Sequence, residues 1–198
     1  MLPRGAEPPQ ILQIYRDFLR PGTDDAYREI EEEAARICAR FKCPNPYLAI
    51  ESLTDPREVW YLNGYRSAAH QTAVYDGYRN NAPLMAALAV IPTRKADLIL
   101  APLEVLAAHR PDLSRGRSWL VGEGRFLVIT VTKGSAEVEG TVFVTDDGTR
   151  FIIGAAQSRG EADAAAAAAG DEARVFAVRP RMSMPAEEWR LADPDFWN

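Results

Sequence analysis

The chain has little of what most readily reveals a function. Its 198 residues hold only two cysteines, Cys38 and Cys43, and two histidines. No CxxC pair and no cysteine–histidine spacing suited to a metal is present. The G-x-S-x-G, Walker A and dinucleotide-binding motifs are missing as well. We therefore expect no metal and no cofactor. A chain of this length buries a core large enough to fold without disulfides or metal.

Long hydrophobic runs and an excess of positive charge are also missing. No apolar run approaches the about 18 residues of a membrane span, and the first residues lack the apolar region of a signal peptide. The 28 acidic residues outnumber the 23 basic ones, for a net charge of −5. Nucleic-acid binding, in contrast, needs a basic face. These absences predict a soluble cytoplasmic protein that binds neither nucleic acid nor membrane.

The apolar pattern of the first half predicts the order strand, helix, strand, strand, helix, strand. The clearest helix spans 24–41, where apolar residues recur at three- and four-residue steps. Cys38 lies on this apolar face, which favours a buried thiol over a redox pair with Cys43. The order is that of a split βαβ, or ferredoxin-like, unit. We expect strands over 11–19, 47–53, 58–63 and 96–103, helices over 24–41 and 67–79, and a further helical stretch over 83–90.

The second half repeats this order without its first helix. We expect strands over 125–133, 138–145, 149–156 and 173–179 and an alanine-rich helix over 159–169. Gly148 would supply the positive φ of a hairpin turn. The pattern predicts a tandem repeat. The two halves are joined by a polar, locally basic segment, for which a linker with an exposed His109 is favoured over an anion site.

These patterns divide the chain into five predicted segments. The C-terminal one holds Trp189, Phe196 and Trp197 and is too apolar for a free tail, so we expect it to pack on the body or on a partner. The segments are a mobile tail (1–9), a ferredoxin-like half (10–108), a linker (109–118), a second ferredoxin-like half (119–185) and the aromatic C-terminal tail (186–198).

Four short features mark residues 10 to 105. A strand with Tyr15 ends in Leu19-Arg20-Pro21-Gly22 and leads into a long helix. Glu58-Val59-Trp60 runs into Tyr65-Arg66-Ser67, and Asn81-Ala82-Pro83-Leu84 precedes a helix. In these features the chain resembles the NIPSNAP and antibiotic-biosynthesis-monooxygenase branches of the dimeric α/β-barrel superfamily. The resemblance implies an α+β fold in which a four-stranded antiparallel sheet carries two helices on one face.

The other face of such a sheet must be buried as well. A second sheet is the natural cover. It would come from the second half of this chain or from another subunit of a homodimer, and either arrangement closes an α/β barrel. The superfamily includes cofactor-independent oxygenases of aromatic polyketides, haem-degrading enzymes and proteins of unknown activity, with a pocket between sheet and helices. The haem-degrading pattern needs an asparagine and a tryptophan where this chain has Tyr15 and Val74, which disfavours that activity.

His70 is the candidate catalytic residue. It lies one turn into the helix that begins after Ser67, on the face that also carries Val74. A histidine there would act as a base toward a phenolic substrate, because its pKa lies near neutrality. A packed or partly exposed structural histidine is the alternative.

Aromatic side chains cluster around this helix and would line a ligand pocket. Tyr61 and Asn63 share a strand face and would orient a hydroxyl or carbonyl group, while Trp60 and Tyr65 would stack on a planar ring. Packing in the core is the alternative for these aromatics. The candidate pocket residues are Tyr15, Trp60, Tyr61, Asn63, Tyr65 and Tyr78.

Three functions follow from this pattern, and whether the protein is an enzyme stays open. The first is an α/β-barrel protein that binds a small apolar or aromatic ligand or acts as a dimeric module. The alternative is a cofactor-independent monooxygenase, an oxidoreductase acting on an aromatic polyketide, phenol or quinone. The third is an interaction protein that binds its partner through the aromatic tail.

Overall fold

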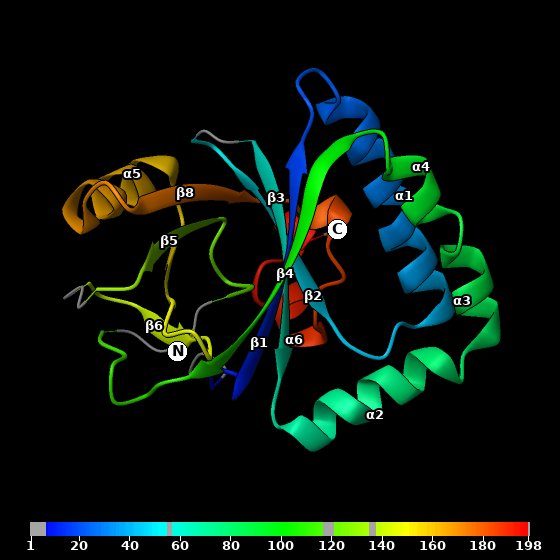
Figure 1. Ribbon diagram of the computed structural model, residues 1–198, viewed down its shortest axis with the longest axis horizontal. Helices are drawn as coiled ribbons and strands as arrows, with labels where there is room; N and C mark the ends of the chain where they lie inside the picture. The colour runs from blue at the N-terminus through cyan, green and yellow to red at the C-terminus, as the bar shows by residue number, and fades with distance from the viewer. Residues whose placement is uncertain (1–6, 55–56, 117–120, 135–137, 198) are drawn as a thin grey trace.

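A computed structural model describes residues 7–54, 57–116, 121–134 and 138–197. Within them, eight antiparallel strands form one closed barrel in the order β1-β3-β2-β8-β5-β7-β6-β4 (Figure 1). The strands are β1 (Ile11–Leu19), β2 (Tyr47–Ser52), β3 (Glu58–Tyr65), β4 (Ile99–His109), β5 (Phe126–Thr132), β6 (Thr141–Val144), β7 (Arg150–Ala156) and β8 (Ala173–Val178). The helices are α1 (Asp24–Phe41), α2 (Ala68–Arg79), α3 (Ala82–Leu88), α4 (Ile91–Lys95), α5 (Arg159–Ala169), the 3-10 helix η1 (Pro180–Met182), α6 (Glu187–Ala192) and α7 (Pro194–Trp197).

The barrel consists of two ferredoxin-like halves. The first half has the strand order β4-β1-β3-β2 and the second half the matching order β8-β5-β7-β6. No helix separates β5 from β6 among the described residues, whereas α1 separates β1 from β2. The halves meet at two short seams, three residue pairs between β2 and β8 and two between β4 and β6. The predicted α+β class, with a second half that lacks its first helix, is therefore confirmed.

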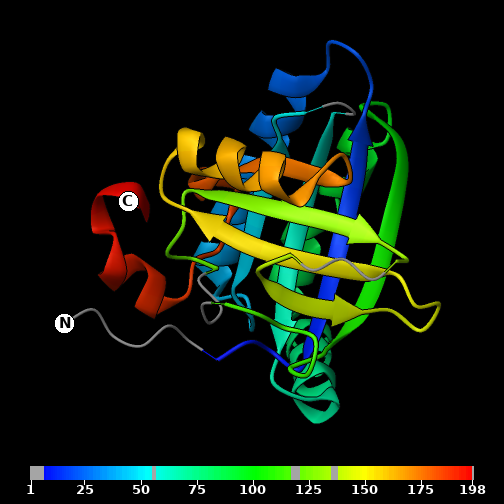
Figure 2. The ribbon, with the colours of Figure 1, turned by 90° about the vertical axis from the view of Figure 1, so that its left-hand side faces the viewer.

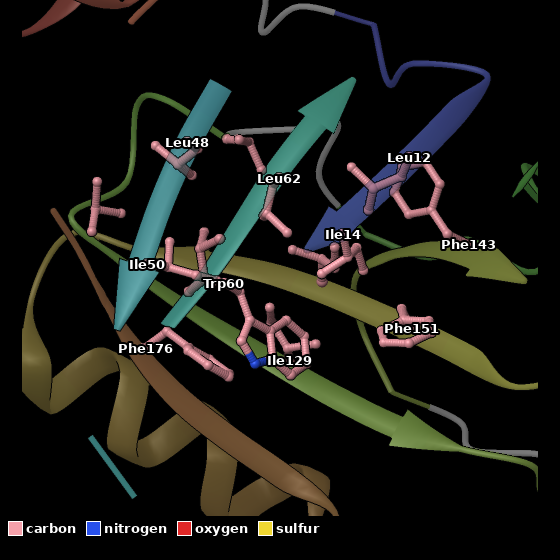
Figure 3. Packing of buried hydrophobic residues seen from close by; sticks show 14 of the residues in the cluster. Leu12, Ile14, Leu48, Ile50, Trp60, Leu62, Ile129, Phe143, Phe151 and Phe176 are labelled. Carbon is pink, nitrogen blue, oxygen red and sulfur yellow. The ribbon is translucent and has the colours of Figure 1, made fainter. Parts of the chain in front are cut away.

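The two sheets cover each other through their inner faces. Leu12 and Ile14 of β1, Ile129 of β5 and Phe176 of β8 are fully buried together inside the barrel (Figure 3). The sheet face that the sequence leaves bare is thus buried by the second half of the same chain. No second copy is needed to close the barrel.

The helices lie on the outer faces. α1 to α4 cover the first half, and α5 lies across the strands of the second half (Figures 1 and 2). α1 ends where Lys42 takes a left-handed conformation, and the backbone N–H of Cys43 donates to the carbonyl of Cys38 at 2.9 Å. A helix that ends in a left-handed residue is often accompanied by a hydrophobic contact between the residues on either side of that end. Here these residues are Cys38 and Cys43. Both thiols are buried against Leu84, as expected of cysteines that act as small apolar side chains.

Several element ends differ from the sequence prediction. β4 begins at Ile99 rather than at 96 and runs through His109. The prediction of an exposed His109 in a linker is therefore wrong, because its half-buried ring lies 5.4 Å from the Phe143 ring. The helical stretch expected over 83–90 is α3, and a second short helix that the sequence did not predict, α4, follows it. The division into five segments stays a prediction, and residues 1–6 of the expected mobile tail and 117–120 around the linker lie outside the described residues.

The C-terminal aromatic residues pack on the barrel. Trp197 is buried in the barrel core cluster, and its indole Nε1 donates to the carbonyl of Gly122 at 3.1 Å. Trp189 and Phe196 are partly buried against the same cluster. Among the described helices, none combines the length and the apolar character needed to cross a membrane.

Candidate functional site

A pocket of about 450 Å³ lies between the outer face of the first-half sheet and the helices α1 and α4. We call it the first-half pocket. Its volume falls within the about 300–1,000 Å³ range of small-molecule sites. Its lining is mostly aromatic and aliphatic with three charged groups: Tyr15, Asp17, Glu31, Tyr47, Tyr61, Pro92, Lys95, Ala96, Ile99 and Pro102.

The charged groups form one network. The ammonium group of Lys95 on α4 lies 2.9 Å from a carboxylate oxygen of Asp17 on β1 and 2.8 Å from one of Glu31 on α1. Tyr27 donates its hydroxyl to the same Asp17 oxygen at 2.6 Å and lies 3.0 Å from the Tyr61 hydroxyl. An ammonium group has three donors. The two carboxylates take two of them, and no third described oxygen or nitrogen accepts from the group. The ammonium also lies 5.7 Å from the Tyr27 ring centroid and 5.8 Å from that of Tyr61.

Packing between helices sets the position of Lys95. Ile91, at the start of α4, is buried against Ile30 and Ala34 of α1. Pro92 lies in the first turn of α4, where a missing backbone N–H costs no hydrogen bond. This short helix therefore carries Lys95 over the outer faces of β1 and β3.

The pKa shifts of Lys95 and Tyr61 indicate how these two groups are protonated. Burial lowers the pKa of Lys95, but attraction by Glu31 and Asp17 outweighs it, so that this pKa is raised. Burial, and then the nearby Tyr27 and Glu31, hold the pKa of Tyr61 well above its usual range. At neutral pH the pocket therefore presents an ammonium cation and an un-ionised phenol. Both can donate hydrogen bonds, and neither is a base.

Strand alternation divides the predicted pocket residues between two faces. Tyr15 and Tyr61 line the first-half pocket. Asn63 and Tyr65 lie further along the same outer face without lining it, and the Tyr65 hydroxyl donates to Gln13 at 2.7 Å.

Trp60 faces the opposite way, into the barrel, where it is fully buried. Its indole Nε1 donates to Glu58 at 2.6 Å, and the Arg16 guanidinium lies 4.4 Å from its ring centroid. The predicted joint stacking of Trp60 and Tyr65 on one ligand ring is therefore wrong, because the two side chains lie on opposite faces of β3.

Tyr78 and His70 lie apart from the first-half pocket. Tyr78 packs against Cys38, Cys43 and Leu84 between the helices. His70 lies in the first turn of α2, where the N-cap Ser67 accepts its backbone N–H at 3.1 Å and its own Nδ1 accepts the backbone N–H of Arg66 at 3.2 Å. Burial, and then the nearby Arg66, lower the pKa of His70.

His70 does border another pocket, of about 610 Å³, at one mouth of the barrel. Leu12, Leu62 and Trp189 contribute its apolar wall. Among the described residues that line this second pocket, none forms a buried ion pair like those in the first-half pocket. The catalytic role of His70 stays a prediction.

Sequence reasoning missed Asp17, Tyr27, Glu31 and Lys95. One signal was present, since Glu31 lies four residues after Tyr27 on the apolar stripe of α1, where a charged residue is rarely buried without a partner. The partner Lys95 gave no such signal, because α4 is too short for a periodic pattern. Among the described residues, no group of three or more acidic, histidine or cysteine side chains could hold a metal ion.

No protein-family model matches the chain, and no curated protein matches it in sequence. Solved structures match it in fold. A putative monooxygenase from Fusobacterium nucleatum aligns over 87% of this chain and 94% of its own, with a TM-score of 0.51 and 10% identity. A NIPSNAP family protein from Agrobacterium tumefaciens aligns over 55% of this chain and 92% of its own, with a TM-score of 0.42 and 14% identity.

A putative antibiotic biosynthesis monooxygenase from Nitrosomonas europaea covers 48% of this chain and 94% of its own, with a TM-score of 0.37 and 13% identity. At these identities the likeness concerns the fold alone. The chain has a ferredoxin-like α/β-barrel fold, as its sequence features predict, and it shares this fold with the putative monooxygenase from Fusobacterium nucleatum.

Proposed function

We propose that this protein binds a small planar aromatic molecule with one hydroxyl or carbonyl oxygen in its first-half pocket. The observation that carries the proposal is the partly buried Lys95 ammonium, which keeps one N–H beyond its two carboxylate partners, beside aromatic and proline side chains. Tyr15 and Tyr61 offer faces and edges against which a ring packs. A ligand oxygen would accept a hydrogen bond from the third N–H of the Lys95 ammonium group, since the two carboxylates accept only two.

Binding of 1-naphthol and naphthalene tests this proposal. We expect 1-naphthol to bind more tightly, and Lys95→Met to weaken its binding by about tenfold to a hundredfold, because a hydrogen bond to a charged group is lost. Naphthalene binding should change little. The exposed Lys133, paired with Asp147 at 2.8 Å, supplies the control variant Lys133→Met.

A second variant separates lost binding from lost folding. Ala96 lines the pocket but is exposed, so Ala96→Phe should block the pocket and leave the charged network intact. Isothermal titration calorimetry, with circular dichroism as the folding check, measures both variants. The proposal fails if folded Ala96→Phe protein binds 1-naphthol as the parent does.

The alternative function is a cofactor-independent monooxygenase. Its specific support is the pairing of two carboxylates with one ammonium group at the pocket. Asp17 would accept a substrate proton, and Lys95 would stabilise the resulting oxyanion. With anthrone, the balanced reaction consumes one O₂ and gives anthraquinone and one water.

Oxygen uptake with anthrone decides between binding and turnover. An oxygenase of this kind should lose at least about a hundredfold in rate in Asp17→Asn, the scale of a general base. A rate unchanged in His70→Ala would remove the histidine from the mechanism. Absence of any uptake by folded wild-type protein contradicts the oxygenase function and leaves ligand binding in place.

We also propose a homodimer, for which the exposed leucines along β4 are the support. Leu100, Leu103 and Leu106 are 60%, 44% and 50% exposed. β4 pairs with β6 only at Ala108 and His109. Light scattering of the parent and of Leu103→Lys tests this, and a monomeric parent would contradict it.

A further inference from the structure

A second cavity lies on the outer face of the second half. It measures about 210 Å³ and is bounded by β5, β6 and β7, by residues 138–140 and by Ala165 of α5. Valine, isoleucine, alanine and glycine make up most of its lining. We call it the second-half cavity, and it shares no lining residue with the first-half pocket.

One polar group in this lining has no partner. Thr130 of β5 is 1% exposed, and its hydroxyl is the buried side-chain polar atom that makes no hydrogen bond within the described part of the chain. Buried polar groups are nearly always paired, and each exception needs an explanation. A bound molecule with a hydrogen-bonding oxygen would supply the missing partner.

A glycine keeps the same cavity open. Gly154 lies inside β7, where a Cβ atom would meet nothing nearer than the carbonyl oxygens of Glu139 at 3.9 Å and Val128 at 4.0 Å. In contrast, a Cβ on Gly140 would come within 2.9 Å of a backbone oxygen. Local sterics therefore do not require glycine at 154. Glycine weakens a strand interior and often marks a close approach by a ligand.

We propose that the second-half cavity binds a one-ring or short-chain apolar compound that carries a single hydroxyl or carbonyl oxygen. Thr130 would hydrogen-bond that oxygen, and the space above Gly154 would hold the apolar part. The size fits, because an apolar cavity of about 150 Å³ is enough for benzene. This site is additional to the first-half pocket and does not rest on the function proposed for it.

Phenol and toluene provide matched probes, because they differ only in a hydroxyl against a methyl group. Amide NMR shifts of Thr130, Gly154 and Ala165 report on the second-half cavity, and those of Tyr61 and Lys95 report on the first-half pocket. We expect phenol to bind about three- to tenfold more tightly than toluene at the second-half cavity, the ratio that one hydrogen bond gives.

Two variants identify the groups involved. Thr130→Val keeps the shape and removes the hydroxyl, so it should abolish the preference for phenol while toluene binds as before. Gly154→Val should exclude both probes. Ala165→Leu fills the cavity from an exposed helix position, so it gives a second blocking variant should Gly154→Val fail to fold.

Three results would overturn the proposal. One is that neither probe shifts the cavity amides up to its solubility limit, which would mean that the space holds water only. Another is that phenol and toluene bind equally. The third is that Thr130→Val keeps the preference for phenol. Shifts confined to Tyr61 and Lys95 would also count against this cavity, whatever they say about the first-half pocket.

Discussion

The two halves of the barrel have alike inner faces and unlike outer faces. Inside, both contribute fully buried apolar residues to one core, such as Ile14 and Ile129. Outside, α1 and α4 border a pocket with a buried charge network, whereas α5 covers the second half beside a mostly apolar cavity. Barrel closure requires only the inner faces. The outer faces are therefore free to differ and to hold different molecules.

Helix content explains why the outer faces differ. α1 has 18 residues and buries Tyr27 and Glu31, which brings polar atoms to the sheet surface. α5 has 11 residues, begins with a Ser158–Glu161 capping box and buries only Ala162. Its small side chains contribute no hydrogen-bonding group to the sheet below. The second-half cavity is thus mostly apolar, and the Thr130 hydroxyl is the buried polar group in its described lining that has no hydrogen-bond partner.

The largest expected effect comes from breaking the ion cluster that joins the halves inside the barrel. Glu58 of β3 lies 2.8 Å from Arg16 of β1 and also pairs with Arg174 of β8, with its side chain fully buried. Glu58→Gln would leave two guanidinium groups without a counter-charge. We expect a loss of about 3–5 kcal/mol in the free energy of unfolding, measured in urea.

The exposed pair Lys133–Asp147 belongs to one half only and supplies the control Asp147→Asn. Exposed pairs contribute little to stability, so this variant should unfold close to the parent. A Glu58→Gln loss no larger than that of the control would mean that the cluster does not hold the halves together.

The next effect tests whether the halves share one core. Ile14 and Ile129 lie on opposite halves, and both are fully buried. Ile14→Val and Ile129→Val should each cost about 0.5–1.5 kcal/mol. Both should lower the midpoint of the same single transition, because one core unfolds cooperatively. The exposed Leu191 gives the control Leu191→Ala. Two separate transitions, each moved by one variant, would contradict a shared core.

Local patterns predicted most of the fold. β1 and α5 have the predicted bounds, because turn residues frame β1 and a cap and a glycine frame α5. The need to bury the bare sheet face predicted a second sheet but left open whether this chain or a second subunit supplies it; the observed barrel shows that this chain does. β4 was the weakest prediction, since its exposed apolar residues do not alternate with polar ones.

The candidate site was harder to predict, because its residues meet only through tertiary packing. Asp17 and Lys95 are 78 residues apart in the chain and lie on elements with no common pattern. The sequence predicted Trp60 as a pocket residue because it is aromatic, but strand alternation alone does not show which face of β3 points into the barrel. The sequence therefore identified Tyr15 and Tyr61 and missed the charges between them.

A smaller change in stability should test whether the second-half cavity is open at Gly154. Gly154→Ala adds a methyl group where space exists, and alanine is favoured over glycine in a strand by about 0.5–1 kcal/mol. We expect a rise in melting temperature. Gly148, with a φ of +84°, supplies the opposite control, since Gly148→Ala should lower the melting temperature. A fall in Gly154→Ala would show that the added methyl group does not fit, which would contradict an open cavity at this position.

The smallest effect is alkaline sensitivity, which should belong to the first half alone. Burial, and then Glu104 and Tyr75, raise the pKa of Tyr15 from 10.0 to about 12. Between these values the unfolded chain loses the phenol proton while the folded protein keeps it, so stability falls as pH rises. The raised pKa of Lys95 acts in the same direction.

The drop in melting temperature from pH 9 to pH 11 should therefore be smaller in Tyr15→Phe than in the parent. The melting temperature of Thr130→Val should drop as much as that of the parent, because no tyrosine or lysine is among the described residues that line the second-half cavity. An equal fall in Tyr15→Phe would mean that Tyr15 does not contribute to the loss of stability at alkaline pH.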